Sequence, residues 1–271
     1  MTRPAWAWIR LGLWWCLTAV TAARGADSVA PSRDALERAA VAGEAEAQYR
    51  LGLLYWEGAE GMTPDPVRAV ELWTAAARKM HAGAIFALGN AVAAGRGVPR
   101  HPGRAAALWR HAADAGHPGA MTALAKAYVA GDGVPADAAE AVRWFQRAAA
   151  RGDIEAEYCL GWHYETGHGV AADPVQAAIC YLNAADAGHA AAQTRLALLY
   201  ANGIGVPKNE VLAHFWLSRA IAGGDREAPG LLRSLERRMS WRERRRARAI
   251  WTEYLQKATP PAAAPASGGA P

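Results

Sequence analysis

The sequence predicts an all-α protein, an alpha-alpha superhelix (solenoid) of about five helix-turn-helix repeats with a C-terminal capping helix pair. Three observations support this prediction. Similar segments recur every 36 residues, and a fixed spacing of 20–50 residues is typical of stacked repeat architectures. Alanine dominates a composition that is 52% hydrophobic and only 8% aromatic, which favours helix over strand. Each repeat also contains two stretches with apolar residues at helical spacing.

The repeat is clearest in one alanine that keeps its spacing without a break, at Ala69, Ala105, Ala141, Ala177 and Ala213. The first copy carries one extra residue, at Ala59–Glu60. This register defines five repeats, at residues 44–81, 82–117, 118–153, 154–189 and 190–225. Because a hairpin of this size cannot bury its apolar face alone, each repeat needs its neighbours in the stack.

The fourth repeat shows how one unit is expected to fold. Residues 155–166 place apolar side chains four apart on one helical face. That helix should end at the Gly-His-Gly-Val turn, because glycine readily takes the left-handed conformation that ends helices. The second helix should begin after the N-cap residue Asp173, with Pro174 in the first helical position. Bulky side chains of the second helices are expected to fill the gaps between pairs, at Trp73, Trp109, Phe145 and Tyr181.

Shorter segments flank the five repeats. Residues 34–43 match the second helix of a preceding half repeat, and residues 226–258 predict two basic capping helices. The last helix should open with a capping box formed by Ser240 and Glu243. Residues 259–271 are rich in proline and alanine and are expected to be disordered.

The first 23 residues have the composition of a signal peptide. Arg3 and Arg10 flank an apolar run of about 13 residues, which is shorter than the roughly 20 needed to span a bilayer. A short linker, residues 24–33, follows. The chain is therefore expected to be exported, either to the periplasm or out of the cell, with an uncleaved anchor as the alternative. A lipid anchor at Cys16 is disfavoured because bulky tryptophans precede it.

Each repeat carries a shared motif. In its first half, alanine is followed after three residues by Leu-Gly, and tyrosine comes two residues later. After two more residues the motif continues with Gly-x-Gly-Val, and then with an acid and an alanine that an aromatic residue follows. This pattern resembles the Sel-one-like repeat, a 36-residue relative of the tetratricopeptide repeat, over residues 34–225. Four positions depart from it: Ala125 and Ala197 replace the motif glycine, Val92 the tyrosine and Met80 the closing glycine. These departures weaken single units and leave the fold prediction intact.

The resemblance implies a non-enzymatic scaffold or adaptor that binds other proteins, often in the bacterial envelope or in signalling complexes. It implies no cofactor, and nucleic acid is not an expected partner of an exported chain. In related arrays the first helix of each repeat lines the concave side. The candidate partner-binding residues here are Arg50, Leu53, Asn90, Lys126, Trp162, Arg195 and Leu198.

These seven residues vary from repeat to repeat while the packing positions recur, as expected of a surface that recognises a partner. An ordinary solvated surface is the alternative. Trp162 is the strongest candidate, because a large exposed aromatic side chain is a common interface anchor.

The C-terminal end offers a second binding hypothesis. Residues 226–257 contain ten basic and four acidic residues, a net charge of +6, whereas residues 27–225 have 17 basic and 21 acidic residues, a net charge of −4. The basic patch comprises Arg237, Arg238, Arg242, Arg244, Arg245, Arg246 and Arg248. It could bind an anionic envelope polymer, a membrane surface or an acidic partner. The alternative is a solvated cap whose arginines pair with Glu236 and Glu243.

Histidines suggest a metal site that the register disfavours. His163, Glu165 and His168 lie within six residues, but no other repeat carries the set. The two histidines are five residues apart, whereas zinc ligands on one helix face are three or four apart. His81, His117 and His189 occupy the joint between repeats where Asp153 and Asp225 stand elsewhere, and they are expected to cap helices.

The cysteines and the remaining motifs give no support to catalysis. Cys159 is expected to be partly exposed and Cys180 packed, both as free thiols. A cysteine-rich branch of the resembled family, to which β-lactam hydrolysis has been credited, carries cysteines where this chain has Glu157, Ala184 and Ala185. With no visible nucleophile–base pair, a β-lactam hydrolase is only a remote alternative. The Gly-x-Gly-Val turns follow no predicted strand, so they are not phosphate loops.

Overall fold

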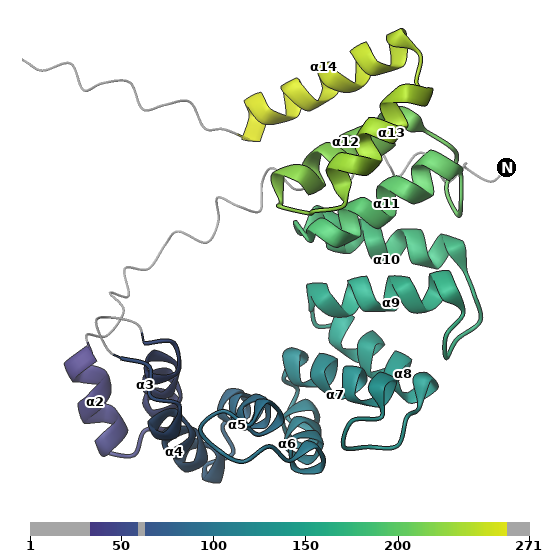
Figure 1. Ribbon diagram of the computed structural model, residues 1–271. Helices are drawn as coiled ribbons and strands as arrows, with labels where there is room; N and C mark the ends of the chain where they lie inside the picture. The colour runs from purple at the N-terminus through teal and green to yellow at the C-terminus, as the bar shows by residue number, and fades with distance from the viewer. Residues whose placement is uncertain (1–32, 59–62, 259–271) are drawn as a thin grey trace, which may run out of the picture.

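The computed structural model describes residues 33–58 and 63–258 (Figure 1). Within these ranges every regular element is an α-helix and no strand occurs, which confirms the all-α prediction. The proposed signal peptide, nearly all of the linker and the proline-rich tail lie outside the described residues.

A half repeat, five hairpins and two capping helices follow one another along the described chain. The half repeat is α2 (Arg33–Val41). The hairpins are α3 (Ala45–Glu57) with α4 (Pro66–Arg78), α5 (Ala82–Ala94) with α6 (Pro102–Asp114), α7 (Pro118–Ala130) with α8 (Ala138–Ala149), α9 (Ile154–Thr166) with α10 (Pro174–Asp186), and α11 (Ala190–Asn202) with α12 (Glu210–Ala222). The capping helices are α13 (Ala228–Arg238) and α14 (Trp241–Ala258).

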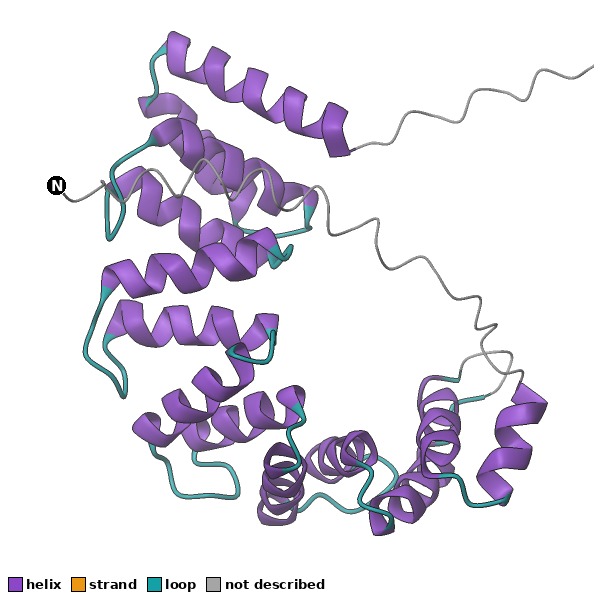
Figure 2. Cartoon of the chain, turned by 180° about the vertical axis from the view of Figure 1, so that it is seen from behind, coloured by secondary structure: helices purple, strands orange, loops and turns teal. Residues whose placement is uncertain are grey.

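The helices stack in sequence order into a curved array. Each helix from α2 to α12 packs against the next one, and α14 returns to pack against α12. The array follows an arc in both views of the chain, with α3, α5 and α7 on its inner side and α4, α6 and α8 on its outer side (Figures 1 and 2). The superhelix prediction is confirmed, and the two capping helices share α12 as their support.

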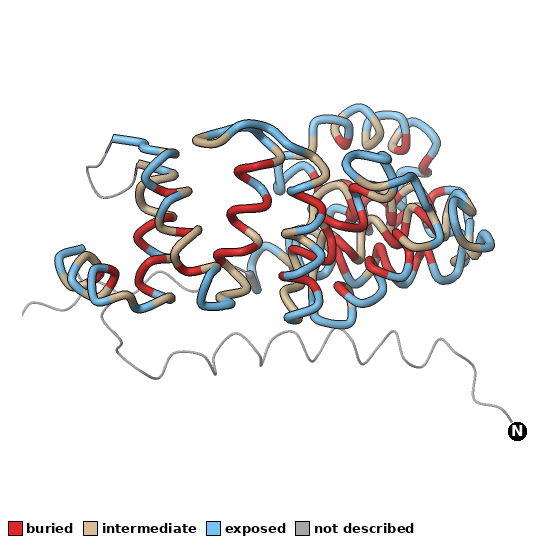
Figure 3. The backbone as a smooth tube through the Cα atoms, turned by 90° about the horizontal axis from the view of Figure 1, so that it is seen from below, coloured by how far each residue is buried: buried red, intermediate tan, exposed pale blue. Residues whose placement is uncertain are grey.

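Buried residues occur along the whole array (Figure 3), in four clusters that follow one another along the chain. The five recurring alanines, Ala69 to Ala213, are completely buried, so the helices of neighbouring repeats approach closely at these positions. Trp73, Phe145 and Tyr181 are buried at 2%, 1% and 0% exposure and fill the gaps as predicted. Trp109 is only half-buried, and its indole N–H donates to Asn90 Oδ1 at 2.9 Å.

Side-chain caps open the helices as the sequence predicts. Each second helix of a repeat begins after a residue whose side chain accepts a hydrogen bond from a backbone N–H in the first turn; these caps are Asp65, His101, Asp137, Asp173 and Asn209. Ser240 and Glu243 form the capping box of α14: the Ser240 N–H donates to Glu243 Oε2 at 2.9 Å, and the Glu243 N–H donates to Ser240 Oγ at 3.3 Å. A lost cap of this kind costs about 1 kcal/mol.

The Gly-x-Gly turns of the second to fifth repeats contact the repeat before them. Gly167 ends α9 with φ of 72°, and its N–H bonds to the carbonyl of His163. The second glycine of this turn, Gly169, lies so close to the preceding repeat that a Cβ atom would be 2.4 Å from the backbone of Ala138. The turn therefore needs glycine both for its conformation and for its contact with α8.

Candidate functional site

The seven candidate residues all lie on first helices, and together we call them the first-helix stripe. Their helices are α3, α5, α7, α9 and α11. Arg50, Asn90 and Lys126 are exposed, whereas the other four are half-buried. None of the seven belongs to the fully buried core, so the stripe forms part of the surface.

Lys126 is held in a network that runs from α7 through α9 to the N-cap of α11. Its Nζ atom lies 2.7 Å from Glu155 Oε1 in the next repeat. The other carboxylate oxygen of Glu155 lies 3.0 Å from His189 Nε2, and His189 is the N-cap residue of α11. Burial alone would raise the pKa of Glu155, but the hydrogen bonds from Lys126 and His189 lower it. The lysine therefore stands in a preformed ion pair and is not an isolated charge.

Two further stripe residues are engaged in the same way. Arg50 Nε pairs with Glu46, and the second oxygen of that carboxylate lies 2.9 Å from His81 Nε2. The hydrogen bond from His81, with help from Arg50, lowers the pKa of Glu46. Asn90 accepts the hydrogen bond from Trp109 described above. The polar half of the stripe is thus fixed in position before any partner arrives.

Trp162 is half-buried, so the expectation of a large exposed aromatic is only partly met. Its ring packs edge-on against His163 and His168, with centroids 5.0 Å and 5.6 Å apart. These rings cover part of the indole because the helix end brings all three side chains together. The exposed part of the Trp162 ring is thus held in place by its contacts with the two histidines.

Arg195 lies near the phenol and carboxylate groups of α9 and α10. Burial alone would lower its pKa, but Glu165, Tyr181 and Tyr158 raise it. The Tyr181 hydroxyl donates to Glu165 Oε2 at 2.6 Å. Burial, followed by this hydrogen bond, raises the pKa of Tyr181, so the phenol stays protonated.

The histidines that suggested zinc are used elsewhere. His163 Nδ1 lies 2.6 Å from the backbone carbonyl oxygen of His168, and the Glu165 carboxylate accepts the hydrogen bond from the Tyr181 hydroxyl. Burial lowers the pKa of His163 and favours the neutral ring. Across residues 33–58 and 63–258 no three His, Cys, Asp or Glu side chains cluster in a way that could hold a metal ion.

The two cysteines have the environments that the repeat register predicts. Cys159 is half-buried, Cys180 is buried, and both are free thiols. Burial raises the pKa of Cys159 to about 11 and that of Cys180 to about 12. Both therefore remain protonated and unreactive near neutral pH.

The basic patch is mostly unpaired. Arg248 lies 3.3 Å from Glu236 Oε1, and Arg244 donates to the Glu236 backbone carbonyl at 2.9 Å. The expected pairing with Glu243 is wrong, because this carboxylate serves the capping box of Ser240. Arg242 lies over the Trp241 ring at 5.7 Å. Within the described ranges Arg248 is the one arginine of the patch with an ion pair, and the other six have none.

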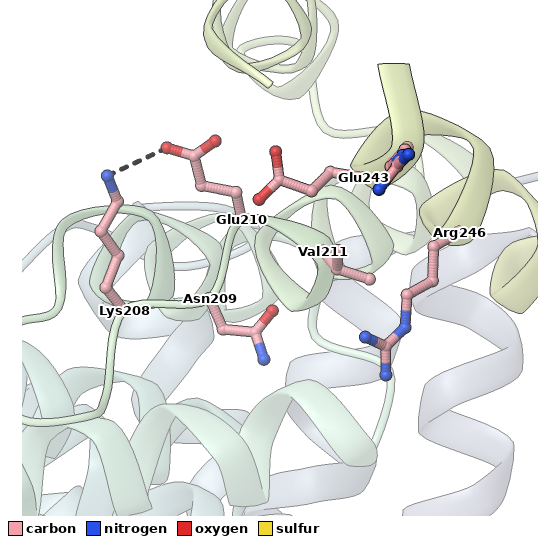
Figure 4. A pocket seen from close by; sticks show the side chains of 7 residues that line it. Lys208, Asn209, Glu210, Val211, Glu243 and Arg246 are labelled. Carbon is pink, nitrogen blue, oxygen red and sulfur yellow. Dashed lines mark ion pairs between the residues drawn. The ribbon is translucent and has the colours of Figure 1, made fainter. Parts of the chain in front are cut away.

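A cleft of about 550 Å³ lies between the start of α12 and α14 (Figure 4). Arg242 and Arg246 line it from α14, and Lys208 lines it from the preceding turn. Two carboxylates share the same space: Glu210, which pairs with Lys208 at 3.1 Å, and Glu243. The lining is therefore mixed in charge and only slightly basic.

Sequence reasoning missed a serine–histidine–glutamate arrangement. Ser218 Oγ lies 3.3 Å from His214 Nδ1, and His214 Nε2 lies 3.2 Å from Glu236 Oε1. The i, i+4 spacing of serine and histidine was the available signal. However, Ser218 is 7% exposed and donates to the His214 carbonyl at 2.9 Å. The group links α12 to α13 and offers a substrate no access.

Comparison with known proteins identifies the repeat. The family model of the Sel1 repeat matches residues 45–79, 82–117, 118–153, 154–189 and 190–225. No curated protein matches the chain.

Solved structures of repeat proteins are similar in fold. One is c5321 of uropathogenic Escherichia coli, a protective antigen displaying an SLR fold, with 30% identity, a TM-score of 0.71, and coverage of 83% of this chain and 48% of that one. Another is a Sel1 repeat protein from Oxalobacter formigenes, with 36% identity, a TM-score of 0.68, and coverage of 74% and 57%. This chain thus spans about half the length of these two. Immunity protein PA5088 from Pseudomonas aeruginosa, at 22% identity and a TM-score of 0.51 over 74% of this chain and 77% of that one, shares the fold.

Proposed function

Because the chain belongs to the Sel1 repeat family, we propose that it is a non-enzymatic scaffold that binds a partner protein along the first-helix stripe. Repeats of this family mediate protein–protein interactions. One observation carries the proposal for this surface. The stripe changes at every repeat, from Asn90 to Lys126 to Trp162, while the alanines in the core beneath it are identical. The repeated core residues maintain the packing of the repeats, and the variable stripe residues give the surface a pattern that differs along the array.

The preformed networks support binding with little loss of side-chain entropy. Lys126 is already oriented by Glu155, and Trp162 is already supported by two imidazole rings. A partner that contacts such groups does not have to order them first. Trp162 is the anchor of this surface, because partly exposed aromatic side chains contribute strongly to binding energy.

The proposed partner is a protein of the bacterial envelope or of a signalling complex. The composition of residues 1–23 supports export to the periplasm or the cell exterior. Among the helices of the described residues, none has the length and apolar character to cross a membrane.

Affinity capture from an envelope extract tests the stripe. The chain from Arg24 onward serves as bait beside a Trp162→Ala, Lys126→Ala variant. The matched control is an Ile179→Ala, Arg143→Ala variant, which also removes one large apolar and one ion-paired basic side chain, but from second helices. We expect the stripe variant to lose at least one captured protein that the control retains. Equal recovery of every protein by the three baits would contradict the proposal.

The basic patch supports a second candidate function, binding to an anionic polymer or membrane surface. The observation behind it is that six of the seven patch arginines lack an ion pair while Trp241, in the same region, is 61% exposed. Sedimentation with phosphatidylglycerol vesicles measures it, with phosphatidylcholine vesicles as control. Binding that disappears at high salt and in an Arg245→Gln, Arg246→Gln variant would favour the patch. A captured protein that remains bound at high salt favours the stripe.

Hydrolysis of a chromogenic β-lactam tests the non-enzymatic assignment. We expect no turnover above the buffer rate, because Ser218 and His214 are 7% and 4% exposed and no substrate reaches them. Turnover that is lost in a Ser218→Ala variant would show that the chain is an enzyme.

A further inference from the structure

The joints between repeats use two kinds of helix cap. Three first helices begin after a histidine whose Nδ1 accepts a backbone N–H at 3.1–3.2 Å; these caps are His81, His117 and His189. Each imidazole also lies against an aromatic ring of the preceding first helix, at centroid distances of 4.8, 4.6 and 4.6 Å; these rings are Tyr49, Phe86 and Tyr158. The other two joints have an aspartate: Asp153 caps α9, and Asp225 Oδ1 accepts from the N–H groups of Glu227 and Ala228 where α13 begins.

The residue that lies against the cap differs between histidine joints and aspartate joints. Where the joint has aspartate, the position equivalent to the stacking ring holds Thr122 or Thr194. A histidine joint is thus a matched pair of an imidazole and an aromatic ring. The pairing closes the contact between one repeat and the next.

A histidine cap works only while its ring is neutral. Neutral imidazole has one nitrogen that accepts a hydrogen bond, and protonation removes it. The positive charge would also face the N-terminal end of a helix, where cations are unfavourable. An aspartate cap keeps its acceptor down to about pH 4. Acid should therefore weaken histidine joints and leave aspartate joints intact.

Two of the three histidine joints have a compensating carboxylate. His81 Nε2 lies 2.9 Å from Glu46, and His189 Nε2 lies 3.0 Å from Glu155. At these joints a protonated ring gains an ion pair that offsets the lost cap bond. At His117 the equivalent position holds Gly83, and no carboxylate oxygen of the part of the chain that the structure describes lies within ion-pair distance of the ring.

The groups that face His117 do not compensate for its protonation. The charge of Asp153 raises the pKa of His117, whereas that of His81 lowers it. The Arg151 side chain lies against the neighbouring Gly116. Burial is the largest effect and lowers the pKa of His117. The His117 ring therefore binds a proton more weakly in the folded protein than in the unfolded chain. The contribution of the neutral ring to folding stability is complete above about pH 6.5 and is lost as the pH falls below that value.

We propose that the joint between α6 and α7 is an acid-sensitive hinge, in which protonation of His117 frees the first turn of α7 and loosens repeats 2 and 3 from each other. The other four joints hold, two through aspartate and two through a carboxylate beside the imidazole. The hinge divides the first-helix stripe between Asn90 and Lys126. The proposal rests on the joint and does not require that the stripe binds a partner.

Hydrogen exchange of the full chain tests the hinge at about pH 7.5 and about pH 5.0, on either side of the ordinary histidine pKa. Protection is corrected for the intrinsic effect of pH. We expect protection of the Ala120 amide to fall about fivefold at the lower pH, the equivalent of a cap bond of about 1 kcal/mol. The Ala156 amide, capped by Asp153, should keep its protection.

A His117→Asn variant provides the decisive comparison, because asparagine caps helices at any pH. It should abolish the fall in protection at Ala120, whereas the matched variant His189→Asn should leave that fall unchanged. An equal fall in wild type and His117→Asn would overturn the proposal. So would an NMR titration of the wild-type His117 ring with a midpoint above about 6.5.

Discussion

Gly161 of α9 lies directly against the ring of Tyr181 in α10, so closely that a Cβ atom on the glycine would be 2.7 Å from two ring carbons. The motif glycine of the repeat is therefore a packing residue: it gives the aromatic side chain of the second helix its place. The same contact joins Gly52 to Trp73 and Gly89 to Trp109. Where alanine replaces the glycine, at Ala125, the residue opposite is the smaller Phe145.

A Gly161→Ala substitution should lower the free energy of unfolding by about 2 kcal/mol. The added methyl group overpacks the contact with a fully buried ring, and overpacking of this kind costs about 1–3 kcal/mol. Urea denaturation followed by circular dichroism measures the change. In Gly230→Ala, the matched control, the new Cβ meets nothing within 4 Å, so stability should hold or rise slightly. Equal effects in the two variants would refute the packing role.

A Met80→Gly substitution should stabilise the protein by about 1 kcal/mol, because a side chain in the left-handed region costs about 1–2 kcal/mol. Met80 has φ of 62° and is 62% exposed, so its side chain contributes little packing. The equivalent Gly188 has φ of 94° with open space around it, and Gly188→Ala should cost a similar amount. Thermal melting of both variants measures this; a lower melting temperature for Met80→Gly would be inconsistent with backbone strain.

A Thr194→Val substitution should also raise stability, by about 1 kcal/mol. The Thr194 hydroxyl is buried without a hydrogen-bond partner, and burial of an unpaired hydroxyl costs about 1–3 kcal/mol. Valine keeps the shape and removes that cost. The control is Thr166→Val, at an exposed hydroxyl that bonds to the Trp162 carbonyl. If Thr194→Val lowers the urea midpoint, the hydroxyl has a partner after all.

The thiols should be unreactive in the folded protein. With a pKa of about 11 for Cys159, only about one molecule in a thousand carries the reactive thiolate at pH 8, and Cys180 has the higher pKa. Ellman's reagent should label the chain from Arg24 onward slowly in buffer and label both cysteines at once in denaturant. A disulfide would reveal itself as failure to label in denaturant without a reducing agent.

The fold was predictable from the sequence because the repeat supplies several independent copies of the same evidence. A single cap such as Asp173 predicts a helix start weakly, but five caps in register predict it firmly. The same register placed Cys180 in the core. Local chemistry and packing agree at these positions, which is why the prediction succeeds.

The surface was less predictable, because its contacts depend on side chains that vary between repeats. The pairing of Lys126 with Glu155 joins residues of different repeats, and only their relative placement across the stack reveals it. Trp162 is half-buried through two histidines that the repeat does not specify. The sequence also gave no sign that α14 packs on α12, since its apolar residues fit more than one neighbour.

Interdependence of the repeats is tested most directly by the isolated fourth repeat. A peptide of residues 154–189 has the helices α9 and α10 but none of the neighbours that bury their alanines. Circular dichroism should show it mostly unordered and without a cooperative melting transition, while the full chain is strongly helical and melts cooperatively. A peptide that forms a stable helical hairpin with its own sharp transition would contradict the dependence of each repeat on its neighbours.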